Sequence, residues 1–288
     1  MKQIRIVTDG GADLPKEISE QYGIEILKMA ITIDDTHMTD SDSLTPLELY
    51  DGMRKGRVYK TAQVPLEEFL TAFSDYADAD TPMIYIALSS GLSGTYNTAL
   101  MAVNMVREDH PNWKSAVIDS KGASAGYSCS AVAAARMVAE GKDFDTIVNY
   151  VTFIAEHMKY VFTVDKLEYL VRGGRLSKAA AAVAGALNIK PIIAFDELGR
   201  LEPVEKVRGM KKTYKRMIQI VKEQAAEPER QTALVLHADC LPVAEEIADT
   251  LKTELGFANT EILMVGATIG AHAGPGTLGI LYLGQLPK

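Results

Sequence analysis

The sequence predicts an α/β protein with two domains. The chain has 288 residues, enough for one large or two ordinary domains with a substantial core. In the first half, short apolar runs alternate with helical patterns, which is typical of a parallel sheet covered by helices on both faces. After Tyr160 the rhythm changes and an antiparallel hairpin is predicted. We therefore expect an α/β domain over residues 1–160 and an α+β domain with a mixed or antiparallel sheet over residues 161–288.

The elements of the first half follow from the apolar pattern and the capping residues. Thr45-Pro46-Leu47-Glu48 is a capping box with proline at the first helical position, so a helix begins there and ends near Lys55. Asp143 caps a later helix that ends near Met158. The other segments are predicted as strands at 4–7, 24–33, 83–88 and 116–118, and as helices from Pro15 and over 65–76, 95–108 and 124–139.

The second half begins with an extended segment at 161–164 and a short helix at 167–171, and a helix of small residues follows the glycines at 173–174. Two extended runs, 189–195 and 200–207, are joined by four turn residues and predict the hairpin, an antiparallel feature that the first half lacks. Two helix–strand units are expected to close the chain: a helix at 210–225 with a strand at 232–237, and a helix at 242–254 with a strand at 261–265.

Composition limits the function classes. With 47% hydrophobic and 24% charged residues the chain matches a soluble globular protein. The net charge of −8 disfavours a nucleic-acid partner, and the basic cluster at 206–216 is local and typical of a solvated surface. Cys129 and Cys240 lack metal-ligand spacing, and no other cluster predicts a metal site. The start of the chain lacks the apolar stretch of a signal peptide, so we expect a cytoplasmic protein with reduced thiols.

Residues 83–96 carry the strongest functional signal. An apolar strand breaks into a Ser/Gly turn and then enters a helix, which directs hydroxyls and backbone N–H groups toward the positive end of that helix. Three further loops of this kind lie where strands are expected to end, at 8–13, 61–65 and 119–126. Because ligands of open α/β sheets bind at the carboxyl ends of strands, the four loops are expected to share one site for a small negative group.

The segment at 269–276 places His272 among three glycines, which is typical either of a ligand site or of a turn with a surface histidine. The order of Ser93, an aspartate and His272 also matches the α/β-hydrolases, so a serine hydrolase or esterase using Ser93 and His272 is the alternative function. Against it, residues 91–95 lack the final glycine of Gly-x-Ser-x-Gly.

Several motifs together resemble one family nearly from end to end. They are Thr8-Asp9 with 12–15, Thr61-x-Gln63, 89–96, 117–120, 167–170 with 173–175, 188–191 and 270–276. In this combination the chain resembles the DegV family. Its members are bacterial fatty-acid-binding proteins, and the best understood are acyl-binding subunits of fatty acid kinase. They carry a fatty acid to a separate kinase subunit, which phosphorylates it to acyl phosphate for phospholipid synthesis.

The resemblance implies a Rossmann-like N-terminal α/β/α domain, mainly parallel, with a lipid tunnel between it and the second domain. It implies that Thr61, Ser93 and His272 bind the carboxylate of a long-chain fatty acid. The backbone of Gly94 would support them, and Arg208 would dock the catalytic subunit of fatty acid kinase. It implies no catalytic residue, cofactor or metal in this chain, and transient contact with a membrane surface fits the role.

Two loops depart from the family pattern. Gly10 stands where serine is usual, and Ala62 and Val64 replace the serine and proline of Thr-Ser-Gln-Pro. Each loop lacks one supporting hydroxyl, so chain-length or saturation preference is expected to differ. If His272 is protonated, it and the carboxylate stabilise each other's charged form, so His272→Ala should weaken retention.

Other side chains admit two interpretations. Some residues fit either a plain core or the wall of an acyl tunnel, since methionine adapts to flexible ligands. Asp165 and Glu168 fit either acid–base chemistry or ion pairs with Arg172 and Arg175. The core-or-tunnel set is Met29, Met83, Met101, Met105 and Phe162.

Overall fold

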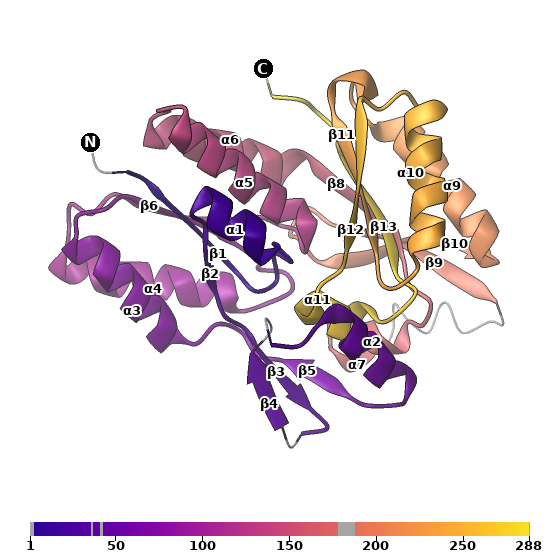
Figure 1. Ribbon diagram of the computed structural model, residues 1–288, viewed down its shortest axis with the longest axis horizontal. Coiled ribbons are helices and arrows are strands. Elements are labelled where there is room, and N and C mark those ends of the chain that lie inside the picture. Colours follow the sequence, from indigo (N-terminus) through magenta and orange to yellow (C-terminus); the bar gives the residue numbers. More distant parts are fainter. Residues whose placement is uncertain (1–2, 36, 41–42, 178–187, 288) are drawn as a thin grey trace.

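The computed structural model describes residues 3–35, 37–40, 43–177 and 188–287. Sheet A has the strand order β2-β1-β6-β7, sheet B the order β4-β3-β5, and sheet C the order β10-β9-β8-β13-β11-β12. Sheets A and C lie in the two halves of the molecule, with α2, α7 and α11 between their lower ends (Figure 1). The predicted α/β class, with a parallel sheet and a mixed sheet, is confirmed.

Sheet A is parallel throughout, as the strand–helix alternation predicts. Helices α5 and α6 cover one face and α3 and α4 the other (Figure 1). The strands are β1 (Arg5–Asp9), β2 (Glu25–Leu27), β6 (Met83–Ala87) and β7 (Ser115–Asp119). The helices are α1 (Lys16–Tyr22), α3 (Leu66–Asp78), α4 (Thr95–Asp109), α5 (Ala125–Ala139) and α6 (Phe144–His157).

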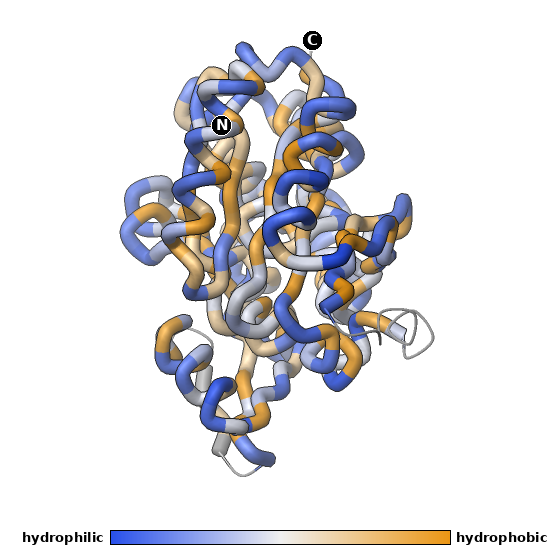
Figure 2. Tube along the Cα trace, turned by 90° about the vertical axis from the view of Figure 1, so that its right-hand side faces the viewer, coloured by the Kyte–Doolittle hydropathy of each residue, from blue (hydrophilic) through white to orange (hydrophobic). Residues whose placement is uncertain are grey.

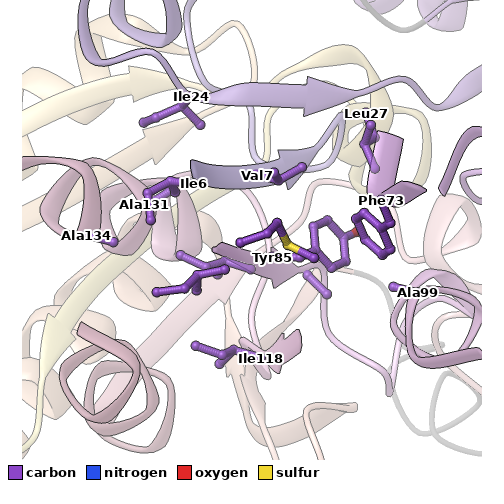
Figure 3. Packing of buried hydrophobic residues seen from close by; sticks show 14 of the residues in the cluster. Ile6, Val7, Ile24, Leu27, Phe73, Tyr85, Ala99, Ile118, Ala131 and Ala134 are labelled. Carbon is purple, nitrogen blue, oxygen red and sulfur yellow. The ribbon is translucent and has the colours of Figure 1, made fainter. Parts of the chain in front are cut away.

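The core of this half is built around β6, which is buried along its whole length because helices cover both faces. Tyr85 lies in the middle of it, and the ring of Phe69 meets it edge to face at 5.3 Å. Figure 3 shows Tyr85 and Phe73 packed beside Val7 of β1. The helix ends follow the predicted caps: Asp143 accepts from the backbone of Thr146 at 2.9 Å, and the capping box at Thr45 forms in full.

Sheet C is mixed and is buried on both faces. On β13, Leu278, Ile280 and Tyr282 pack toward α9 and α10, whereas Leu281 faces sheet A. The outer helical turns alternate between hydrophilic and hydrophobic residues, while the inner strands carry longer hydrophobic stretches (Figure 2). The elements are β8 (Met158–Thr163), β9 (Ile189–Phe195), β10 (Leu201–Arg208), α9 (Met210–Gln224), η1 (Pro228–Arg230), β11 (Thr232–His237), α10 (Leu241–Thr253), β12 (Asn259–Met264) and β13 (Leu278–Leu283).

Three expectations about the elements are wrong. The extended run at 24–33 is two strands, because it leaves sheet A after β2 and enters sheet B as β3. Sheet B is antiparallel, so the first half does contain an antiparallel feature. The strand at 259–264 does not close the chain, because β13 follows and inserts between β8 and β11. Sheet B and the nearby helices are β3 (Ala30–Ile33), β4 (His37–Asp40), β5 (Tyr59–Thr61), α2 (Pro46–Arg54), α7 (Glu168–Arg172) and α11 (Ala267–Ala273).

The predicted hairpin of β9 and β10 forms, and its turn packs on the Ser/Gly loop of the other half. The buried hydroxyl of Ser89 donates to the carbonyl oxygen of Gly199 at 2.7 Å, and a Cβ on Gly91 would lie 2.5 Å from the same oxygen. This contact joins the two halves. The chain enters sheet C at Met158, and a domain boundary at residue 160 stays a prediction. The predicted small-residue helix falls at 178–187, which lie outside the described residues.

Candidate ligand-binding site

A central cavity lies between sheet C and the loops that follow sheet A. Its lining is mainly apolar. Leu88 precedes the Ser/Gly loop and Leu92 lies in it, Phe162 comes from β8, and Leu236 and Leu281 come from β11 and β13. Pockets with an apolar lining and a few convergent polar groups are typical of small-molecule sites.

Most of the polar lining comes from the segments nearest to α7 and α11, and Ser124 and Tyr160 are the polar residues elsewhere in the wall. Thr61, the last residue of β5, and His272 of α11 are joined by a hydrogen bond of 2.7 Å between Oγ1 and Nε2. Sheet B brings Thr61 there because β5 pairs with β3 and ends beside α11. Two residues that are 211 positions apart in the chain are therefore in direct contact.

Ser93 and Gly94 lie at the start of α4. The Ser93 hydroxyl is 2.8 Å from the Thr95 hydroxyl and accepts from the Thr95 N–H at 3.3 Å. Gly94 is exposed, and the amide of Gln63 lies so close that a Cβ on Gly94 would be 2.1 Å from its oxygen. The loop thus presents a hydroxyl and first-turn N–H groups beside the positive end of a long helix.

Arg175 adds a positive charge to this end of the cavity. Its half-buried guanidinium donates to the carbonyl oxygens of Leu92, at 3.1 Å, and Gly173. Within the described ranges it makes no ion pair, and burial lowers its pKa. The sequence prediction gave Arg175 no binding role and assigned it to ion pairs. Asp165 instead pairs with Lys190 at 2.8 Å, because the start of β9 lies beside it, and Glu168 lies nearest to Lys166.

Burial and the charge of Arg175 favour the neutral form of His272. Burial, followed by the charge of Arg175, lowers its pKa from 6.5 to about 4. Its second ring nitrogen, Nδ1, is buried and has no hydrogen-bond partner in the described chain. It faces Gly173, where a Cβ would come within 2.1 Å. The mutual stabilisation of a protonated His272 and a carboxylate therefore requires that the carboxylate raise this pKa.

The serine-hydrolase arrangement does not form in this geometry. The Ser93 hydroxyl is bonded to Thr95, and His272 Nε2 is bonded to Thr61. No carboxylate among the described residues orients the imidazole through Nδ1. A nucleophile–base hydrogen bond and an oriented base are the two contacts that such catalysis requires.

The sequence model of the family described as "Uncharacterised protein, DegV family" matches residues 3–285 of this chain. The chain belongs to the DegV family. A DegV domain-containing protein of Clostridium perfringens is 35% identical over 287 residues, which is 99% of this chain and 99% of that protein.

Solved structures of the DegV family share this fold. A Ruminococcus gnavus protein, in a refinement with vaccenic acid, has a TM-score of 0.86 and 26% identity over 98% of this chain and 100% of its own. Bacillus subtilis DegV, described as a fatty acid binding protein, has a TM-score of 0.84 and 29% identity over 98% and 99%.

Three of the four predicted loops of this DegV-family chain contribute to the cavity. The loop at 8–13 does not, because Asp9 is buried in a hydrogen-bond network of sheet A. Gly10 and the exposed Ala62 do not line the cavity, and Val64 is fully buried in the core. The missing hydroxyls therefore fall outside the site.

The residues considered for either the core or the tunnel wall fall into three groups. Met29 and Phe162 line the cavity, Met83 belongs to the sheet A core, and Met101 and Met105 are exposed. In the described chain, no group of three or more His, Cys, Asp or Glu side chains is placed to hold a metal ion. The described helices include none that is long and apolar enough to cross a membrane.

We expect His272 to make stability depend on pH. The unfolded chain binds this proton near pH 6.5 and the folded chain only near 4, so His272 stabilises the fold above pH 6.5 and progressively less as the pH falls. The full effect is roughly 3 kcal/mol. Urea unfolding of wild type and His272→Gln from pH 4 to pH 7.5 measures it. A difference between them that does not change with pH would contradict the assignment. Burial raises the pKa of Asp13 to about 7, so Asp13 makes stability depend on pH with the opposite sign. This contribution is the same in wild type and variant and cancels when the two are compared.

Gly173→Ala should displace the imidazole of His272, since the added Cβ would overlap Nδ1. We expect the Nε2 resonance of His272 to move in a ¹⁵N NMR spectrum as the contact with Thr61 is lost. Gly174→Ala is the matched control. Its φ of +73° makes the substitution cost about 1 kcal/mol of strain, but open space surrounds it. Equal shifts in both variants would mean that Gly173 does not support the ring.

Proposed function

We propose that this protein binds a long-chain fatty acid in the central cavity and presents the carboxylate to a separate kinase subunit. The observation that carries the proposal is a mainly apolar cavity whose polar groups gather at one end. An acyl chain has the same distribution of polarity. The fatty acids named for the Ruminococcus gnavus and Bacillus subtilis relatives support this ligand class.

The carboxylate would be bound by Thr61, Ser93, His272 and the backbone N–H of Gly94. The two hydroxyls and the N–H group are neutral donors, and Arg175 supplies the charge that a buried carboxylate requires. Binding would raise the pKa of His272, since a nearby negative charge favours the imidazolium. The expected mutual stabilisation would then begin only when the ligand arrives.

The partner would approach at the same end of sheet C. Arg208 ends β10 opposite Ile189, and the next residue, Lys190, is bonded to Asp165 between β8 and α7. Arg208 is exposed, and the antiparallel register of β9 with β8 puts its partner Ile189 past the end of β8 from which the chain continues to α7 and Arg175. A kinase subunit that contacts Arg208 could reach the carboxylate past the exposed Gly94. In this role the chain supplies no catalytic residue, and phosphorylation to acyl phosphate would feed phospholipid synthesis.

Purified protein should contain about one intact fatty acid per chain, measured by mass spectrometry of the extracted lipid. His272→Ala should retain less, because it loses a contact to the carboxylate and frees Thr61. His110→Ala is the control, since His110 pairs with Asp78 on the surface. Absence of bound fatty acid after incubation with a saturating amount would overturn the proposed function. Labelling of Ser93 by a fluorophosphonate probe would favour the hydrolase instead.

Arg208→Glu should leave fatty acid retention unchanged and reduce acyl phosphate formation with the kinase subunit by about tenfold or more, the size typical of an interface arginine. Lys252→Glu introduces the same charge change at an exposed position of α10 and should have no effect. Equal activity of the two variants would exclude Arg208 from the docking surface.

A further inference from the structure

A second hollow lies behind the central cavity, between α5 and the inner face of sheet C. It is a groove lined by Ala125 and Cys129 from α5 and by Leu234, Leu263 and Leu283 from the sheet. The groove also has a polar side, to which Asp13, Ser128, Ser130, Arg136, Gln231 and Glu261 contribute. The proposed carrier function uses the central cavity only.

The cavity and the groove share one face of sheet C. On β13, Gly279 lines the cavity, Leu281 lines both hollows, and Leu283 lines the groove. The same order holds on β11, where Leu236 lines the cavity and Leu234 the groove. Residues two apart point to the same side of a strand, so both hollows lie along one continuous apolar track.

The groove lies at the end of this track that is remote from the polar groups. β13 starts shortly after α11, which carries His272, so Thr277 and Gly279 are near the polar end. From Thr277 to Leu283 the strand advances about 20 Å at ~3.3 Å per residue. An acyl chain with its carboxylate at His272 would therefore point its methyl end at the groove.

The barrier between the hollows is thin. Leu281 packs in a small apolar cluster with Ala125 and Tyr160, and Cys129 contacts this cluster from the groove side. Tyr160 is tightly confined, because a Cβ on Gly122 or Gly126 would lie within 2.0 Å of its hydroxyl. Leu281 is buried in this cluster and is the side chain that lines both hollows.

We propose that the groove is a second acyl compartment, which receives the methyl end of fatty acids too long for the central cavity, with Leu281 as the divider. The inference rests on the proposed fatty acid binding and adds to it a class of longer acyl chains. Its ligand is the terminal methylenes of the same molecule whose carboxylate is held at Thr61 and His272.

Cys129 reports directly on occupation of the groove. The wild-type protein is loaded with dodecanoic, hexadecanoic, eicosanoic or docosanoic acid and treated with methyl methanethiolsulfonate, and modification is counted by mass spectrometry. We expect eicosanoic and docosanoic acid to slow modification of Cys129 at least fivefold, and dodecanoic acid to leave it unchanged. Cys240 does not line the groove and is the internal reference.

Two variants test the divider in opposite directions. Leu281→Ala should join the hollows and strengthen binding of the longer acids relative to hexadecanoic acid by about fourfold for each methylene newly buried. Ala133→Trp fills the groove without touching the cavity, and should weaken binding of docosanoic acid but not of hexadecanoic acid. Leu281→Val removes one methylene from the divider and serves if the alanine variant does not fold.

The outcomes separate this inference from the proposed function. If extracted lipid shows the longer acids bound while Cys129 stays equally reactive at every chain length, the groove is not an acyl compartment. Equal protection of Cys129 by dodecanoic and docosanoic acid would also overturn it. If no acid of any length is retained, the proposed function fails and this inference fails with it.

Discussion

The binding loops depend on one buried carboxyl group. Asp9, at the end of β1, accepts hydrogen bonds from the hydroxyls of Tyr85, at 2.7 Å, and Tyr127, at 2.8 Å. It also accepts from the N–H groups of Gly11 and Leu88, both at 3.0 Å. A buried carboxyl group is tolerated only with such a set of partners. Leu88 is the residue before the Ser/Gly loop and Tyr127 lies in the first turn of α5, so Asp9 fixes the points from which the loops at 89–95 and 120–124 leave sheet A. Because both loops line the cavity, the position of Asp9 determines where that part of the cavity wall lies.

The cavity and its polar end have different energetic roles in the proposed function. Burial of a sixteen-carbon tail offers on the order of 10 kcal/mol before ordering costs, at ~0.8 kcal/mol per methylene. Removing the carboxylate from water costs several kcal/mol unless it is fully hydrogen-bonded or paired. The tail therefore determines affinity, while the polar end determines orientation. The bond between Thr61 and His272 keeps both groups in place when no ligand is present.

Local signals in the sequence sufficed for the elements but not for the contacts between them. The capping box at Thr45 and the cap at Asp143 are read from adjacent residues, and both form. β13 was missed although residues 278–283 are an apolar run, because the glycines before it suggested only a loop. The strands of sheet B have three or four residues, too few to show the alternation of apolar and polar residues that identifies a strand in a sequence. Thr61 and His272 were joined by the family resemblance, since no spacing rule relates residues 211 apart. The ion pairs considered for Arg175 do not form, because Asp165 pairs with Lys190 and Glu168 with Lys166.

The same geometry explains how a carrier could hold a carboxylate and still leave it reactive. A carboxylate has two oxygens and about four lone-pair positions. Hydroxyls at Thr61 and Ser93 and the imidazole of His272 would occupy three of them from within the cavity. The fourth would be held only by the backbone N–H of Gly94 and would face the exposed Gly174, which has open space around it. Because small residues line this approach and the charge of Arg175 lies beside it, the acid would stay bound by its tail while a partner acts on its head. A site that surrounded the carboxylate completely would bind as well but could not pass it on.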